Sequence, residues 1–118
     1  MDIYREEILE HWRNPLNFGK IEDATLIIDQ VNPLCGDQVT FYFKIENGKV
    51  KNVKFTGNGC AISIAASSIL SEKIKNKNVK SLSSITGKDV LALLGGTVAP
   101  ARLKCVFLSL EVIRKISP

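Results

Sequence analysis

The stretch VTFYFKIENGKVKNVKFT, residues 39–56, decides the fold of this chain. Apolar and polar residues alternate through its first half, which is typical of a strand with one buried face. Asn47 and Gly48 follow, and both residue types adopt positive φ angles readily, so a tight hairpin turn is predicted there. The returning strand, residues 49–56, holds Val50 out of step with its later apolar residues, which predicts a β-bulge.

The segments on either side of this hairpin complete the predicted fold. Residues 24–31 favour a third strand, and after Gly57-Asn58-Gly59 the apolar period lengthens to that of a helix. The predicted helices cover residues 2–13, with Tyr4 and Trp12 as packing aromatics, residues 61–75, residues 86–94, with Thr86 and Asp89 as a capping box, and a segment after Pro100. We therefore predict an α+β fold, a three-stranded antiparallel sheet with helices packed on one face, in a single domain spanning residues 1–118.

Composition excludes several classes of protein. A chain of 118 residues with net charge +4 has scattered lysines and no dense basic tract, so a solvated surface is expected in place of a nucleic-acid face. No apolar run approaches the length of a membrane span, and the acidic amino-terminal segment is unlike a secretory signal. Three cysteines, an odd and sparse set, do not suit an extracellular disulfide framework, so we expect a cytoplasmic protein without a membrane or nucleic-acid partner.

Each cysteine falls at a junction between predicted elements. Cys35 lies in the turn Asn32-Pro-Leu-Cys-Gly-Asp37, Cys60 directly precedes a helix, and Cys105 lies near the first turn of the last helix. A helix amino terminus favours a thiolate, and Arg102 and Lys104 beside Cys105 are expected to lower the pKa of that thiol. The alternatives are that each cysteine is a small buried apolar residue, and that Asp37 caps its turn.

The three thiols and Asp37 suggest one shared site. In the turn before the sheet, Pro33 fixes φ and Gly36 allows a sharp bend, so Cys35 and Asp37 can face the same point. Thiolate and carboxylate donors suit a borderline-soft cation such as zinc or iron. Three thiolates and one carboxylate leave a charge of about −2 around a divalent ion, and an oxygen ligand exchanges more readily than sulfur. The hypothesis is a labile working centre of Cys35, Asp37, Cys60 and Cys105.

Three motifs in order, spread over nearly the whole chain, resemble the NifU-like N-terminal domain family, the U-type iron–sulfur cluster assembly scaffolds with IscU and SufU branches. The motifs are Tyr4 with HWRNPLNFG (residues 11–19), NPLCGD (residues 32–37) with GNGCAISIAASS (residues 57–68), and RLKC (residues 102–105). The resemblance implies the sandwich fold of that family. It also implies that Cys35, Cys60 and Cys105 hold a transient [2Fe–2S] cluster, iron or, in the cluster-free form, zinc, with Asp37 as fourth ligand or labilising neighbour.

The resemblance also implies partners. Sulfur would arrive as a persulfide from a pyridoxal-phosphate cysteine desulfurase, with Cys35 or Cys105 as the first acceptor, and clusters would pass to acceptor apo-proteins. Lys104 stands where the IscU branch has a ligating histidine, and an ammonium group cannot ligate, so Asp37 is expected to be the fourth donor. Residues 98–102 differ from the segment that a specialised Hsp70 chaperone reads, which argues against that partner.

Two functions remain open from the sequence. One is a non-enzymatic scaffold that builds and transfers an iron–sulfur cluster. The other is a zinc-dependent sulfurtransferase that relays persulfide from the desulfurase. Lys104 resembles the SufU branch and favours the second, whereas the spacing from Cys60 to Cys105 resembles the IscU branch and favours the first. A small zinc module for nucleic acid is disfavoured, because stacking aromatics and a cationic tract are missing.

Overall fold

The computed structural model describes residues 3–33, 36–95 and 103–116, with the side chains of residues 6–33, 36–95 and 103–116. In chain order the elements are α1 (Ile3–Arg13), β1 (Leu26–Val31), β2 (Gln38–Glu46), β3 (Lys49–Asn58), α2 (Ala61–Ile74), the 3₁₀ turn η1 (Val79–Ser84), α3 (Gly87–Leu93) and α4 (Leu103–Ile116). The strands form one sheet in the order β1-β2-β3, with antiparallel neighbours.

The hairpin of β2 and β3 forms as the sequence predicts. Asn47 and Gly48 take φ angles of 54° and 75°, which is the left-handed conformation that the tight turn requires. The pairing of the two strands shifts register between Lys44 and Ile45, so that Val50 pairs with Ile45 and is fully buried. The predicted bulge is thereby confirmed, and it is the reason why Val50 reaches the core although it is out of step in the sequence.

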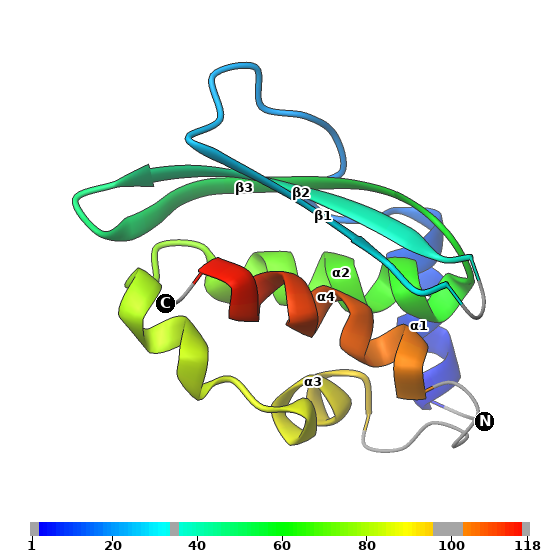
Figure 1. Cartoon of the computed structure of the whole chain (residues 1–118). Coiled ribbons are helices and arrows are strands. Elements are labelled where there is room, and N and C mark those ends of the chain that lie inside the picture. The colour runs from blue at the N-terminus through cyan, green and yellow to red at the C-terminus, as the bar shows by residue number, and fades with distance from the viewer. Residues whose placement is uncertain (1–2, 34–35, 96–102, 117–118) are drawn as a thin grey trace.

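Helices α2 and α4 lie side by side against one face of the sheet, as Figure 1 shows. The sheet meets them with Phe41, Phe43 and Phe55, which are fully buried with ring centroids 5.5–5.9 Å apart in two stacked pairs. Burying such a side chain contributes about 2–3 kcal/mol. Alanines and serines on the buried side of α2 let the helix approach closely. The predicted α+β fold with helices on one face is confirmed.

The chain between α1 and β1 covers one edge of the sheet. The Gly19 amide donates to the Phe55 carbonyl at 2.8 Å, and the Phe55 amide donates to the Asn17 carbonyl at 2.9 Å. The Phe18 ring packs edge-on against Phe55, with centroids 5.4 Å apart. These contacts satisfy backbone groups of β3 that a bare edge would leave exposed.

One local expectation was wrong. Trp12 is 45% exposed, because α1 packs mainly against α2 and its buried stripe is narrow, with Ile8 as the buried residue. The polar segment after α2 leads into the turn η1, whose Leu82 is buried under α4. The predicted packing of Tyr4 concerns a side chain outside the described part of the chain. Among the described helices, none has the length and apolar character needed to cross a membrane.

Candidate metal site

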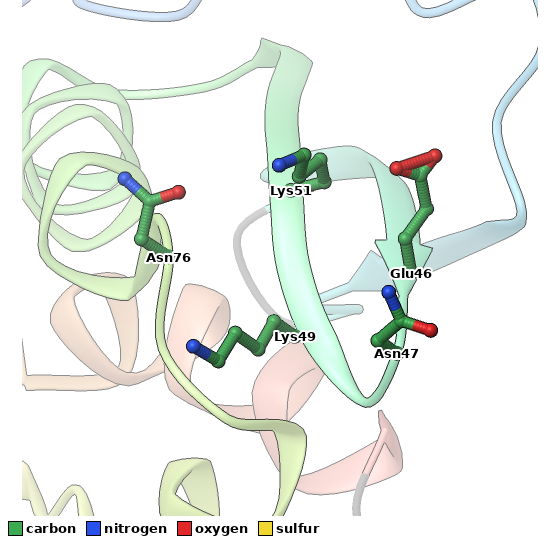
Figure 2. Close-up of a pocket in the computed structure, with 5 residues that line it drawn as sticks. All are labelled: Glu46, Asn47, Lys49, Lys51 and Asn76. Carbon is green, nitrogen blue, oxygen red and sulfur yellow. The ribbon is translucent and has the colours of Figure 1, made fainter.

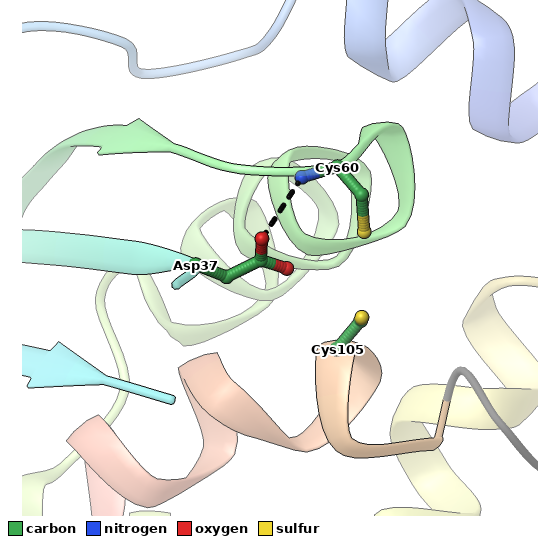
Figure 3. A group of neighbouring side chains, drawn as sticks. All are labelled: Asp37, Cys60 and Cys105. Carbon is green, nitrogen blue, oxygen red and sulfur yellow. Dashed lines mark hydrogen bonds between the residues drawn. The ribbon is translucent and has the colours of Figure 1, made fainter. Parts of the chain in front are cut away.

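Three of the four predicted ligands converge at one end of the sheet. Asp37 directly precedes β2, Cys60 is the N-cap residue of α2, and Cys105 lies in the first turn of α4. One carboxylate oxygen of Asp37 and the two sulfur atoms all lie within 4.8 Å of one another. Figure 3 shows both thiols and the carboxylate turned toward a common point. Residues far apart in the sequence are therefore assembled by the ends of three different elements.

Asp37 occupies its position because it caps helix α2 from outside. The N-cap residue Cys60 makes no side-chain cap hydrogen bond, and the first turn of α2 contains no acidic residue. Asp37 supplies what is missing: its Oδ1 accepts from the Cys60 amide at 3.3 Å, and its Oδ2 accepts from the Ser63 hydroxyl at 2.5 Å. A carboxylate is favourable at the positive end of a helix. Asp37, with only 6% of its surface exposed, is therefore satisfied although it is buried.

Gly59 makes room for this contact. A Cβ atom built on Gly59 would lie 2.8 Å from Cγ and 2.9 Å from Oδ1 of Asp37, closer than real Cβ contacts. The glycine before Cys60 therefore lets the carboxylate lie flat against the backbone that opens α2. This role was not predicted from the sequence, where Gly59 marks only a change of period.

The environment of Cys105 differs from the expectation. Burial, then the hydrogen bond and charge of Cys60 and those of Asp37, raise the pKa of the Cys105 thiol to about 12. The sequence predicted that Arg102 and Lys104 lower the pKa of Cys105. For Lys104, which the structure describes, this prediction was wrong. Lys104 is exposed on α4 and lines a separate groove of about 320 Å³, whereas Cys105 turns inward and is 4% exposed. Arg102 lies outside the described residues.

The carboxyl group of Asp37 shifts in the opposite direction. Burial by itself raises the pKa of Asp37. The hydrogen bonds from the Ser63 hydroxyl, from the Cys60 and Cys105 thiols and from the Cys60 amide together outweigh burial, so the pKa of Asp37 lies below its usual value. The site thus holds one stable carboxylate beside a thiol that keeps its proton at neutral pH.

Cys35, the remaining predicted ligand, lies outside the described residues. Its neighbour Gly36 has a φ of 76°, and the Gly36 amide donates to the Asn32 carbonyl at 2.8 Å. The Asn32 amide in turn donates to the Asp37 carbonyl at 2.8 Å. The sharp bend expected at Gly36 is therefore present, and it leads directly into Asp37.

Two further polar residues, His11 and Ser63, have defined side-chain hydrogen-bond partners. His11, the only histidine in the sequence, is half-buried, with Nδ1 2.8 Å from the Ser68 hydroxyl, and the described cluster of ligating atoms does not include it. Ser63 was not singled out beforehand, yet its hydroxyl touches Asp37 and lies 3.6 Å from the Cys60 sulfur. Its position three residues after the N-cap was the available signal, because that residue lies beside the free end of the helix.

The donors fit a zinc or iron ion. Two thiolates bound to one tetrahedral zinc lie roughly 3.8 Å apart, given Zn–S bonds of about 2.3 Å. The observed limit of 4.8 Å requires only a small contraction. Sulfur with one carboxylate oxygen matches zinc and iron better than magnesium or calcium, which prefer oxygen alone.

A second hollow lies at the opposite end of β3 from Cys60. Its volume is about 490 Å³, and Figure 2 shows the residues around it, Glu46, Asn47, Lys49, Lys51 and Asn76. All five are exposed polar residues, four of them at the hairpin and Asn76 just after α2. It lacks convergent ligating atoms, so the chemistry of the described residues is concentrated at the thiols.

Known proteins agree with this architecture. The chain is 34% identical to the zinc-dependent sulfurtransferase SufU of Bacillus subtilis, covering 96% of this chain and 88% of that one. It is 38% identical to the iron–sulfur cluster assembly scaffold protein IscU of Aquifex aeolicus, covering 93% and 71%. A crystal structure described as an iron–sulfur cluster assembly scaffold protein for the SUF system, from Fervidobacterium islandicum, superposes with a TM-score of 0.77 at 27% identity, covering 93% of each chain.

The two alignments differ in length. The alignment with the Bacillus subtilis protein runs over 130 positions, more than the 118 residues of this chain, so that relative carries residues that this chain lacks. The alignment with the Aquifex aeolicus protein runs over 112 positions. The family described as "NifU-like N terminal domain" matches residues 3–116. The chain therefore belongs to the family of NifU-like N-terminal domains.

Proposed function

We propose that this chain is an iron–sulfur cluster assembly scaffold. It accepts sulfur from a cysteine desulfurase, builds a [2Fe–2S] cluster on Cys35, Cys60 and Cys105 with Asp37 as the exchangeable fourth donor, and passes the cluster to acceptor apo-proteins. The iron and sulfur are then the cargo of the protein. The chain matches relatives named as iron–sulfur cluster assembly scaffolds over 71–73% of their length, and this supports the proposal.

The observation that carries the proposal is the convergence of Asp37, Cys60 and Cys105 within 4.8 Å from three separate elements. Buried structural cysteines would be expected among apolar side chains, apart from one another. Here two thiols and a carboxylate share one point, and the carboxylate is held there by hydrogen bonds. Such a set of donors suits a soft cation with one replaceable ligand.

Burial bears on which thiol receives sulfur first. A thiolate attacks the outer sulfur of the donor persulfide, the S–S bond breaks, and the desulfurase cysteine leaves as a thiolate. Cys105 is 4% exposed and its pKa is raised to about 12, so in the metal-free fold it is a poor nucleophile. We therefore propose Cys35 as the first acceptor, with Cys105 taking part once a metal has displaced its proton.

A second candidate function is a zinc-dependent sulfurtransferase, in which zinc stays bound and one cysteine relays persulfide. Lys104 favours it, because this exposed residue stands where a ligating histidine would otherwise precede Cys105. The identity with the sulfurtransferase of Bacillus subtilis also supports it. The spacing from Cys60 to Cys105, which resembles that of the IscU branch, supports the scaffold instead.

Anaerobic reconstitution tests the two candidates. The protein is incubated with ferrous iron, cysteine, a desulfurase and dithiothreitol. Reducing two sulfane sulfurs to sulfide takes four electrons, of which dithiothreitol supplies two and the two iron ions, which become ferric, supply the other two. A scaffold develops visible absorption, and the absorption is lost in Cys35→Ala, Cys60→Ala and Cys105→Ala. Asp29→Ala, which changes an exposed carboxylate on β1, is the matched control and should behave as the wild type.

The opposite result is equally clear. A colourless protein that retains one zinc per chain and accelerates alanine release by the desulfurase supports the sulfurtransferase. A wild-type protein that binds neither zinc nor iron, and that does not accelerate the desulfurase, contradicts both functions. Metal analysis of protein purified without oxygen decides which ion occupies the site.

A further inference from the structure

The hydroxyl of Ser63 lies inside the metal site without being a ligand. Ser63 is 1% exposed, and its Oγ donates to Asp37 Oδ2 at 2.5 Å while lying 3.6 Å from the Cys60 sulfur. A buried hydroxyl normally has a hydrogen-bond partner, and here the partner is the carboxylate proposed as the oxygen ligand. Ser63 belongs to the first turn of α2, which the core holds in place.

Three contacts therefore fix the position of the Asp37 carboxylate. The Cys60 amide holds Oδ1, the Ser63 hydroxyl holds Oδ2, and Gly59 closes one face with no room for a Cβ atom. Each carboxylate oxygen has a further lone pair, so these bonds leave the group able to bind a cation. Without the Ser63 bond, the carboxylate could rotate about its side-chain torsions and the oxygen would no longer be fixed beside the two sulfurs.

We propose that Ser63 is a positioning residue for Asp37 and sets how tightly the site holds a metal ion. The inference rests on the proposed function, because it takes Asp37 to be a ligand. Partners that orient a metal ligand through a hydrogen bond typically change metal affinity by about 10- to 100-fold when they are removed. Ser63 acts by fixing the rotamer of the carboxylate, not by touching the ion.

The same helix provides a matched control. Ser67 lies four residues after Ser63, is fully buried, and its hydroxyl has no hydrogen-bond partner among the described residues. Ser67→Ala therefore makes the same chemical change in the same buried helix without touching Asp37. A role of Ser63 limited to packing would make the two alanine variants alike.

The test measures the binding of zinc and cobalt to the full chain by competition with a chelator. Ser63→Ala should weaken zinc binding by about 10- to 100-fold. It should also alter the cobalt absorption spectrum in the direction seen for Asp37→Ala. Ser67→Ala should stay within about threefold of the wild type, and Ser63→Thr, which keeps the hydroxyl, should restore most of the affinity. Thermal unfolding of the metal-free proteins shows that each variant is folded.

A double variant separates positioning from a general structural effect. In the Asp37→Ala background, Ser63→Ala should have no further effect on zinc affinity, because the group that it orients is absent. Equal losses in Ser63→Ala and Ser67→Ala, or an undiminished effect of Ser63→Ala in the Asp37→Ala background, would overturn the inference while leaving the proposed site intact. A wild-type protein that binds neither zinc nor cobalt would instead overturn the proposed function.

Discussion

Replacing Asp37 by alanine should change stability and cluster lifetime in opposite directions. In the metal-free protein the carboxylate accepts from the Ser63 hydroxyl at 2.5 Å and from the Cys60 amide at 3.3 Å. Hydrogen bonds to a charged group contribute about 1.5–3 kcal/mol, and the loss leaves two buried donors without their acceptor. The longer bond is weak, and alanine relieves the burial of a charge, so we expect a net loss of about 2 kcal/mol.

This loss is large enough to measure. For a chain of this size it lowers the melting temperature by about 5–10 °C. Urea unfolding in the presence of a chelator gives the free energy directly. The pKa of Asp37 is lowered in the folded state, so its contribution is present above the usual value of 3.8 and disappears as the pH falls through the lowered pKa. Wild type and Asp37→Ala should therefore converge in stability under acid conditions.

The reconstituted cluster should respond in the other direction. The proposed oxygen ligand exchanges more readily than a thiolate, so its replacement by another ligand is the expected first step of cluster loss. Asp37→Ala removes that step, and its cluster should decay several-fold more slowly when a chelator is added. Asp29→Ala is the control. Asp29 also accepts a hydrogen bond from a hydroxyl group, that of Thr40, but it lies on the exposed side of β1. Unchanged stability of the metal-free Asp37→Ala protein, or faster loss of its cluster, would refute this reasoning.

Four more outcomes are expected. Gly59→Ala should push the Asp37 carboxylate away, since the new Cβ would lie 2.8 Å from its Cγ, and should weaken zinc binding about tenfold in chelator competition; unchanged affinity would show that the carboxylate is free to move. The pKa of Cys105, raised to about 12, means that zinc must displace its proton at neutral pH, so zinc affinity should rise about tenfold per pH unit for this thiol, and Cys105→Ser should reduce that slope by about one. The metal-free fold should also lose stability as the pH rises from about 9 toward 12, because the folded state retains the Cys105 proton longer than the unfolded chain. Ser68→Ala removes the acceptor of the Leu16 amide at 2.8 Å and should cost about 1–2 kcal/mol in urea unfolding with no change in zinc affinity; an altered affinity would mean that this part of α2 reaches the site.

The parts of the fold that could be predicted are those that local patterns determine. Alternation and the Asn47-Gly48 turn predicted the hairpin, and Thr86 with Asp89 predicted the start of α3, where both capping-box bonds are present. These features depend on residues within a few positions of one another. The turn η1 was missed because it contains only two apolar residues, Val79 and Leu82, which are too few to establish a period.

The convergence of Asp37, Cys60 and Cys105 could be predicted from the sequence, but the surroundings of these residues could not. Cys60 and Asp37 could be chosen from their chemistry and from the junctions where they lie. The burial of Cys105 could not, because the sequence places it beside Lys104 and a helix sends adjacent side chains in different directions. The pKa expected from charged neighbours in the sequence therefore had the wrong sign. Ser63 was overlooked for a similar reason, since its partner Asp37 is distant in the chain.

The carboxylate of Asp37 serves two purposes, and this bears on how a metal would leave the site. A ligand that has no other role is left uncompensated in the buried site when its ion departs. Asp37 instead remains hydrogen-bonded to the first turn of α2, and its low pKa shows that the charged form is stable there without an ion. The metal-free state is therefore stabilised by the same group that would bind the cation, which lowers the cost of release. For a protein that must give up its cargo, a ligand satisfied in both states is better suited than a fourth thiol, which would regain a proton only by burying it as Cys105 does.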